Sequence, residues 1–115
     1  METILILYVV AGLLSAIIAV PLIKGKVKPN ALYGFRVPQT LNDPDVWYAV
    51  NAHFGRRLLL TGIATTLAAI VLYRVPGLDV DSYAWALLAV YGLFFGVGLV
   101  QSWRYMKTLS HSTLP

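Results

Sequence analysis

The first apolar run of the chain, from Thr3 to Ile23, contains no charged residue and most strongly limits what this sequence can fold into. Its roughly 20 residues are enough for a helix to cross a ~30 Å hydrocarbon core. A cleaved signal peptide is the alternative. However, Glu2 stands where a signal carries basic residues, and the run exceeds the ~7–15 residues of a signal's apolar core. We therefore predict a retained membrane span over residues 3–23.

The second apolar run, Leu58–Tyr73, is short for a membrane span, but the residues before it also suit a helix. Asp43 is a suitable N-cap, Pro44 fits the first helical position, and Asp45 complements the positive end of the helix dipole. One long helix is therefore predicted, which is interfacial at its start and spans the membrane over 56–73.

The third apolar run predicts a span over 83–105. The fold class is thus an all-α membrane protein, with three transmembrane helices in a single domain covering residues 1–115. Composition supports this class, because 58% of the residues are hydrophobic and only 12% are charged, whereas soluble domains carry about 25% charged residues. Between the first two spans we expect an ordered cytoplasmic-side loop and an interfacial helix over 28–57.

The placement of the basic residues predicts the orientation. The second connection has Arg74 with the acids Asp79 and Asp81, whereas the first has six bases: Lys24, Lys26, Lys28, Arg36, Arg56 and Arg57. The positive-inside rule then places the first connection and the C-terminus in the cytoplasm and the N-terminus outside, in a multi-pass protein of the cell membrane. Bases that flank apolar runs fit lipid rather than nucleic acid, and we expect lipid headgroups at Lys24, Lys26 and Lys28.

Small residues mark the faces on which membrane helices approach closely. Gly12 and Ala16 form such a pair on the first helix, and Gly92 and Gly96 form a GxxxG on the third. These faces either build the three-helix bundle or, for Gly92 and Gly96, make a homo-oligomer. Aromatic side chains near the ends of the runs are expected as headgroup-level anchors: Tyr73, Tyr83, Trp85, Trp103 and Tyr105.

Enzymatic chemistry finds little support in the sequence. The chain has no cysteine, which excludes disulfides, cysteine-ligated metals and thiol catalysis. His53 and His111 are too few and too far apart to indicate a metal site, and no serine–histidine–acid arrangement or phosphate loop is present. We expect no catalytic residue, no cofactor and no metal.

The connection between the first two spans carries the most information. Pro38 disfavours helix at Val37, so an ordered extended segment over 33–41 is expected at the membrane surface. A spaced set of residues runs through this connection into the next helix: Pro29, Asn30, Gly34, Arg36, Pro38, Thr40, Leu41, Trp47, Asn51, Phe54 and Gly55. This pattern resembles the signature of the SdpI family of bacterial membrane proteins over about residues 28–62. Val37 and Gln39 depart from it, since the family usually has threonine and an aromatic residue there.

The resemblance implies a multi-pass membrane protein that binds a partner. The family's namesake protects its producer from a secreted toxin peptide, and it relays the toxin's presence by holding a repressor at the membrane. The chain is therefore interpreted as an SdpI-like membrane binding protein, in immunity to a membrane-active toxin peptide or in membrane signalling, with a peptide toxin or a membrane protein as partner. Two alternatives remain, namely an accessory or structural subunit of a larger membrane complex and a small oligomeric transporter.

Arg36 is the leading candidate for a ligand or partner contact. A charge among apolar neighbours needs a carbonyl, a carboxylate or a phosphate. A lipid phosphate, an acid such as Asp43 or Asp45, or a bound partner would each supply one. Asn30 belongs to the same candidate site through its place in the signature.

The other candidate site residues are Thr40, Trp47 and Asn51. Thr40 is expected to make local turn or cap hydrogen bonds, with a ligand contact as the alternative. Trp47, Asn51 and Phe54 recur at i, i+4 and i+7, so they share one helix face. This face either docks the preceding loop, with Asn51 pairing the loop backbone, or forms a groove for a partner.

Overall fold

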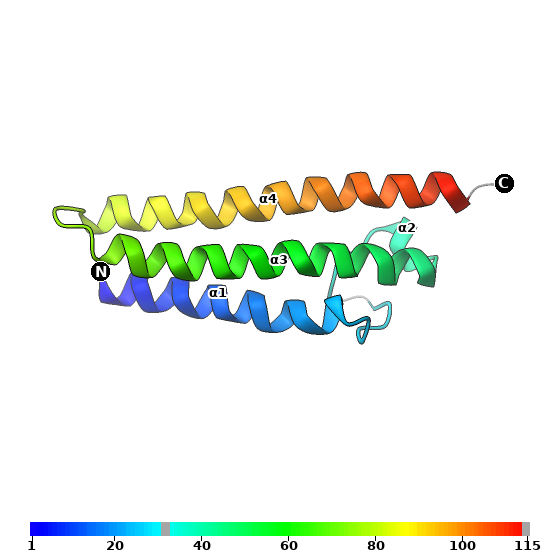
Figure 1. Ribbon diagram of the computed structural model, residues 1–115, viewed down its shortest axis with the longest axis horizontal. Coiled ribbons are helices and arrows are strands. Elements are labelled where there is room, and N and C mark those ends of the chain that lie inside the picture. Colours follow the sequence, from blue (N-terminus) through cyan, green and yellow to red (C-terminus); the bar gives the residue numbers. More distant parts are fainter. Residues whose placement is uncertain (31–32, 114–115) are drawn as a thin grey trace.

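In a computed structural model, three long helices lie side by side, with a folded loop at one end (Figure 1). The structure describes residues 1–30 and 33–113, with side chains to Leu109, so that His111 lies outside the described side chains. Its helices are α1 (Glu2–Ile23), α2 (Pro38–Leu41), α3 (Pro44–Tyr73) and α4 (Val80–Thr113).

The middle helix, α3, packs against both α1 and α4, which touch each other only slightly (Figure 1). The molecule measures 60 × 22 × 19 Å, so it is a narrow rod with all three long helices along its axis. The N-terminus and the last described turn of α4 lie at opposite ends of this rod (Figure 1). An odd number of spans requires this arrangement.

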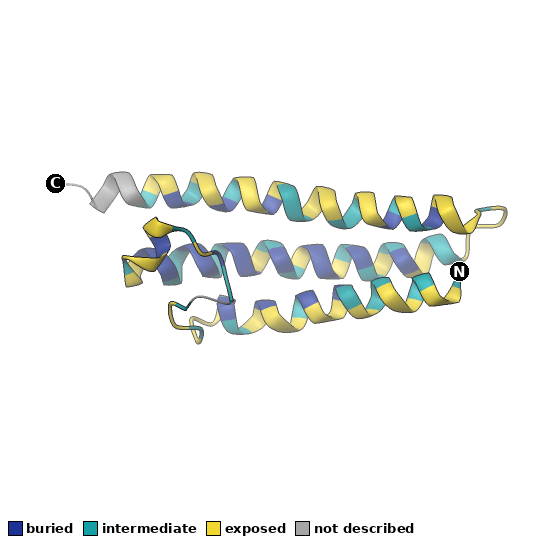
Figure 2. Ribbon diagram, turned by 180° about the vertical axis from the view of Figure 1, so that it is seen from behind, coloured by how far each residue is buried: buried dark blue, intermediate teal, exposed yellow. Residues whose placement is uncertain are grey.

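Three helices are long and apolar enough to cross a membrane. Averaged over the 18 consecutive residues that are most apolar, the mean hydropathy is 2.7 in α1, 1.4 in α3 and 1.9 in the Val80–Leu109 part of α4. Many large apolar side chains are exposed, such as Ile17, which is 64% exposed. Exposed positions recur along all three long helices (Figure 2). Such a surface suits lipid and would be an aggregation hazard in water. The predicted all-α fold with three membrane-spanning helices is confirmed.

A glycine with a left-handed backbone conformation, Gly25, lies just past the end of α1. Gly25 has φ +69°, and the amides of Gly25 and Lys26 donate to the carbonyls of Leu22 and Pro21 at 3.3 and 2.9 Å. These two bonds form a Schellman motif, in which a left-handed glycine satisfies the last carbonyls of a helix. The chain therefore turns sharply back toward α3 directly after the span.

The predicted long helix is confirmed as the uninterrupted helix α3. Asp43 caps it, because its Oδ1 accepts from the Asp45 amide at 3.0 Å, and Pro44 occupies the first helical position. Since one helix carries both the residues before the second span and the span itself, any side chain on its early turns is held rigidly relative to the bundle.

Glycines bring α1 and α3 into backbone contact. A Cβ added at Gly12 would lie 2.7 Å from the carbonyl oxygen of Gly62, and one at Gly55 would lie 3.0 Å from that of Ala19. The small residues of the first two spans thus build the bundle. By contrast, a Cβ added at Gly92 or Gly96 would meet no described atom within 4 Å, so the GxxxG of α4 is not packed against any other described part of the chain.

Tyr83, which was predicted to be an anchor at the membrane interface, instead packs against α3. Tyr83 is fully buried, and its hydroxyl donates to the Ala69 carbonyl at 2.7 Å. It therefore joins α4 to α3, whereas its neighbour Trp85 is 70% exposed. The anchor prediction was wrong for Tyr83 because the start of α4 turns this residue toward α3.

The prediction of one extended segment over 33–41 was wrong, because residues 33–35 bend, with Gly34 at φ +112°, and a helical turn begins at Pro38. Val37 is extended, with φ −133° and ψ 165°, as its position before Pro38 requires. The helical turn α2 then begins, because proline has the φ that a first helical position needs. The segment also folds onto α3, since Phe35 and Thr40 are buried.

Candidate functional site: the signature loop and the surface around Arg36

Asn51 on α3 holds the loop by its backbone. Its Oδ1 accepts from the Phe35 amide at 2.6 Å, and its Nδ2 donates to the Trp47 carbonyl at 3.0 Å and to the Phe35 carbonyl at 3.4 Å. The Asn51 side chain is 2% exposed. A buried amide that satisfies both polar groups of one loop residue replaces the pairing that a β-strand would provide.

Thr40 forms hydrogen bonds with the backbone of Phe35 and Val37 in the loop. Its Oγ1 accepts from the Val37 amide at 3.0 Å and lies 2.9 Å from the carbonyl oxygens of both Phe35 and Val37, to either of which it can donate. Thr40 is fully buried. The predicted local hydrogen bonding of Thr40 is confirmed.

Trp47 ties the beginning of the connection to α3. Its Nε1 donates to the Val27 carbonyl at 2.7 Å, and its ring is fully buried. Asn30 acts more locally, because its Oδ1 accepts from the Tyr33 amide at 2.7 Å and its Nδ2 donates to the Lys28 carbonyl at 2.8 Å. The shared face of Trp47 and Asn51 thus docks the preceding loop, which is the first of the two predicted alternatives for it.

Gly34 lets the loop approach this face. Its φ is +112°, a region that side chains disfavour. A Cβ there would also lie 2.7 Å from Asn51 Oδ1 and 3.3 Å from the ring of Trp47. The glycine, tryptophan and asparagine of the signature therefore belong to one packing arrangement.

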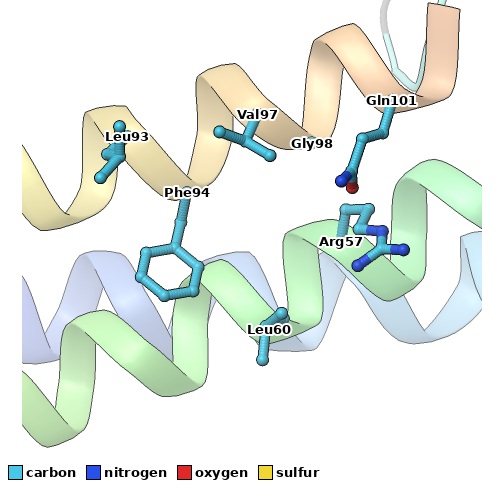
Figure 3. Close-up of a pocket in the computed structure, with 7 residues that line it drawn as sticks. All are labelled: Arg57, Leu60, Leu93, Phe94, Val97, Gly98 and Gln101. Carbon is cyan, nitrogen blue, oxygen red and sulfur yellow. The ribbon is translucent and has the colours of Figure 1, made fainter. Parts of the chain in front are cut away.

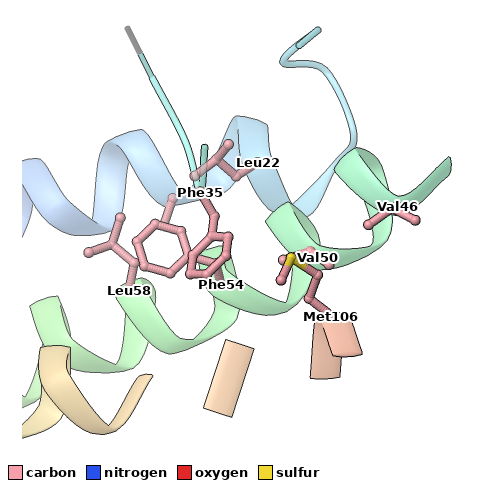
Figure 4. Packing of buried hydrophobic residues seen from close by; sticks show 8 residues of the cluster. Leu22, Phe35, Val46, Val50, Phe54, Leu58 and Met106 are labelled. Atoms are coloured by element: carbon pink, nitrogen blue, oxygen red, sulfur yellow. The ribbon is translucent and has the colours of Figure 1, made fainter. Parts of the chain in front are cut away.

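Below these hydrogen bonds lies an apolar cluster that joins all three long helices (Figure 4). Phe35 from the loop packs on Phe54 of α3, with ring centroids 5.7 Å apart, and Phe54 meets Phe95 of α4 edge-on at 6.1 Å. Leu22 of α1 and Met106 of α4 complete its sides. The loop is thus held by apolar burial as well as by hydrogen bonds.

Arg36 lies on the outward side of this arrangement. It is exposed, while its neighbour Phe35 is 8% exposed. Arg36 borders a hollow of about 280 Å³ whose apolar lining includes Phe54, Phe95 and Leu99. The loop therefore presents one cation beside aromatic and aliphatic side chains.

A second hollow adjoins the first. It measures about 430 Å³ and shares Phe35 and Leu99 with it. Its other lining residues include Arg104, Lys107 and Trp103, and the Lys107 Nζ lies 5.5 Å from the centre of the Trp103 ring. We call the two hollows together the Arg36 surface. Its lining residues include three cations and no carboxylate.

The sequence did not link Arg36 to the end of α4. Trp103 was expected only as a headgroup-level anchor, and about seventy positions separate it, Arg104 and Lys107 from the loop. No local pattern pairs such distant residues. The lysines Lys24, Lys26 and Lys28 are exposed at the loop end of the rod, apart from the Arg36 surface.

His53 has a partner that the sequence did not indicate. Its Nδ1 lies 3.1 Å from Ser102 Oγ, and its ring stacks on Tyr105 with centroids 4.8 Å apart. These contacts join α3 to α4 close to the loop.

Fold and site together define a class, namely a multi-pass α-helical membrane protein with a loop docked on its central helix. A family model for the SdpI/YfhL protein family matches residues 26–102, which is more than half of the chain. The chain belongs to this family, as the resemblance of the signature predicted. The match begins just after α1 and continues beyond the signature into α4. No match was found among curated proteins or among solved structures.

Proposed function

We propose that this protein is a membrane binding protein whose binding site is the Arg36 surface. The observation that carries the proposal is a difference in exposure between Arg36 and the other candidate site residues of the signature. Asn30, Thr40, Trp47 and Asn51 turn their polar groups toward the chain's own backbone. Arg36 alone among the candidate site residues is exposed.

The chemistry of this surface supports an amphipathic partner with an acidic group. Arg36, Arg104 and Lys107 provide positive charge, and the aromatic lining provides apolar contact. Arginine pairs well with a carboxylate through two parallel hydrogen bonds. A membrane-active peptide with a carboxylate, or a segment of a membrane protein, meets both requirements. Binding such a peptide would serve immunity to a toxin or signalling, as the family resemblance implies, and it needs no catalysis.

Orientation is part of the proposal. The loop end of the rod carries Lys24, Lys26 and Lys28, which we expect to meet lipid headgroups on the cytoplasmic side of the cell membrane. The C-terminal end of α4 would then also be cytoplasmic, and the N-terminus outside. The Arg36 surface would face the cytoplasmic boundary of the bilayer.

The test is the sensitivity of a bacterial host to a panel of membrane-active peptides. The host expresses the wild type, Arg36→Ala, or the control Arg74→Ala, which removes an exposed arginine from the opposite end of the rod. We expect the wild type and Arg74→Ala to protect against at least one peptide and Arg36→Ala to protect against none at equal membrane abundance. Protection by Arg36→Ala equal to that by the wild type would contradict the proposal.

A subunit of a larger membrane assembly is the second candidate function. It is favoured by the outward glycines Gly92 and Gly96, above which no described atom lies within 4 Å. Such a face permits close approach of another helix. Gly96→Leu should then remove a stoichiometric membrane partner, or a second copy of the chain, from the protein extracted in mild detergent. Unchanged co-purification would contradict this role.

A further inference from the structure

A pocket between α3 and α4 lies outside the Arg36 surface and combines apolar walls with one cationic end (Figure 3). Its volume is about 200 Å³. Leu60 of α3 and Leu93, Phe94 and Val97 of α4 provide the walls, while Arg57 and Gln101 stand at one end (Figure 3). The pocket therefore has the polarity of an amphiphile, with a polar end and an apolar body.

The polar end lies near one membrane boundary. At ~1.5 Å per residue, Arg57 is about 24 Å along α3 from Tyr73, and Gln101 is about 27 Å along α4 from Tyr83. Tyr73 and Tyr83 lie together at the other end of the rod, with ring centroids 6.3 Å apart. Given a ~30 Å hydrocarbon core, Arg57 and Gln101 reach the same headgroup level, and the apolar walls extend from there into the core.

Both polar groups lack a partner within the described chain. No described carboxylate lies within 4.0 Å of the Arg57 guanidinium, and Gln101 Oε1 is buried without a hydrogen bond. A buried polar atom without a partner is unfavourable. A half-turn of the amide about its last torsion exchanges the positions of its oxygen and nitrogen, so the Gln101 side chain can serve as a donor as well as an acceptor. The pocket thus offers a guanidinium and an amide for which the described residues provide no acceptor.

The stem of Arg57 is held in place by α4. A Cβ added at Gly98 would lie 2.9 Å from the Cβ of Arg57, so the two helices approach closely here and the stem has little space to move. A positioned guanidinium at the headgroup level matches a phosphate group in charge and geometry.

We propose that this pocket binds one anionic phospholipid, with its phosphate on Arg57 and Gln101 and one acyl chain along Leu60, Phe94 and Val97. This site is distinct from the exposed lysines at the loop, which would meet headgroups without selecting a single lipid molecule. It does not depend on the proposed role of the Arg36 surface.

The test is native mass spectrometry of the full chain in detergent, titrated with phosphatidylglycerol or with phosphatidylcholine of the same acyl chains. Arg57→Gln should weaken phosphatidylglycerol binding by about tenfold, as expected for loss of a charged hydrogen bond. Arg56→Gln is the matched control, because it removes the same charge from the adjacent exposed position. It should leave the affinity unchanged, and phosphatidylcholine should bind weakly to every variant.

A second pair of variants tests the apolar part without removing a charge. Val97→Trp fills the pocket and should abolish the retained lipid, whereas Leu88→Trp changes an exposed residue of the same helix outside the pocket and should not. Equal weakening by Arg56→Gln and Arg57→Gln would overturn the proposal, and so would equal binding of both lipids to the wild type. Retention of phosphatidylglycerol by Val97→Trp would overturn it as well.

Discussion

Asn51 and Phe35 form the central contact of the docked loop, since one buried side-chain amide on α3 pairs with both backbone polar groups of a loop residue. The next residue along the chain is Arg36, which is exposed and borders the hollow lined by Phe54 and Phe95. The position of the proposed binding cation is thus set by the hydrogen bonds of its neighbour.

Replacing Asn51 should release the loop. Asn51→Ala leaves the Phe35 amide buried and unpaired, whereas the Phe35 carbonyl keeps the Thr40 hydroxyl as a partner. One such unpaired group costs about 1–3 kcal/mol. We expect a loss of about 1–3 kcal/mol in unfolding free energy, measured by detergent titration. Hydrogen exchange at the Phe35 amide should accelerate at the same time. Asn42→Ala, at an exposed position of the same connection, should change neither quantity, and an equal effect of the two variants would exclude the Asn51 contact as the reason.

The glycine of the docked loop should tolerate no side chain. Gly34→Ala places a Cβ 2.7 Å from Asn51 Oδ1 at a φ of +112°. Gly77 also has a positive φ, +81°, but with no described atom within 4 Å, so Gly77→Ala isolates the backbone penalty of about 1–2 kcal/mol. Gly34→Ala should destabilise the protein by about 1–3 kcal/mol more, because it also breaks a buried hydrogen bond. Similar unfolding free energies for the two variants would argue against close packing at Gly34.

The start of α4 should give the protein a measurable acid sensitivity. Hydrogen bonds from the Ser82 hydroxyl and amide lower the pKa of Asp79, whose Oδ1 accepts from the Ser82 amide at 2.7 Å. A lowered pKa in the folded state means that Asp79 stabilises the fold above its ordinary value of 3.8. That contribution is lost as the pH falls from there through the lowered pKa.

Asp79→Asn provides the comparison, because asparagine also caps a helix but does not titrate. The wild type should melt above Asp79→Asn at pH 7, and the difference should shrink as the pH falls below 4. A difference in melting temperature that stays constant down to pH 3 would show that the charge of Asp79 does not stabilise α4.

Labelling of single cysteines should reveal the orientation, because the chain has no cysteine of its own. Gln39 and Pro76 are exposed at opposite ends of the rod. A membrane-impermeant maleimide should label Pro76→Cys in intact cells and Gln39→Cys only after permeabilisation. The reverse pattern would contradict the proposed cytoplasmic location of the loop.

Much of the fold was predictable from local patterns. The uncharged runs indicated the three spans, and Asp43 with Pro44 marked the start of a helix that continues to Tyr73. The spacing of Trp47 and Asn51 placed both on one face and allowed for loop docking. These features depend on residues within a few turns of one another, which is where sequence patterns are informative.

The direction in which each long helix faces was not predictable. Membrane helices are apolar on all sides, so hydropathy does not distinguish the face of Tyr83 that packs on α3 from the lipid-facing side of Trp85. For the same reason, hydropathy did not predict the pocket at Arg57 and Gln101, and it did not predict that Arg104 lies close to the loop. The turn α2 was missed because the steric effect of Pro38 restricts only the residue before it, Val37, and leaves the conformation of the later residues open.

The most direct test of the central claim compares cysteine labelling at two adjacent positions, Phe35→Cys and Arg36→Cys, in permeabilised membranes. The docked loop predicts rapid labelling at position 36 and little at position 35, where the native side chain is 8% exposed. Adding Asn51→Ala should make position 35 reactive. Equal labelling at the two positions without Asn51→Ala would show that the loop is not docked on α3, and that Arg36 is not presented as described.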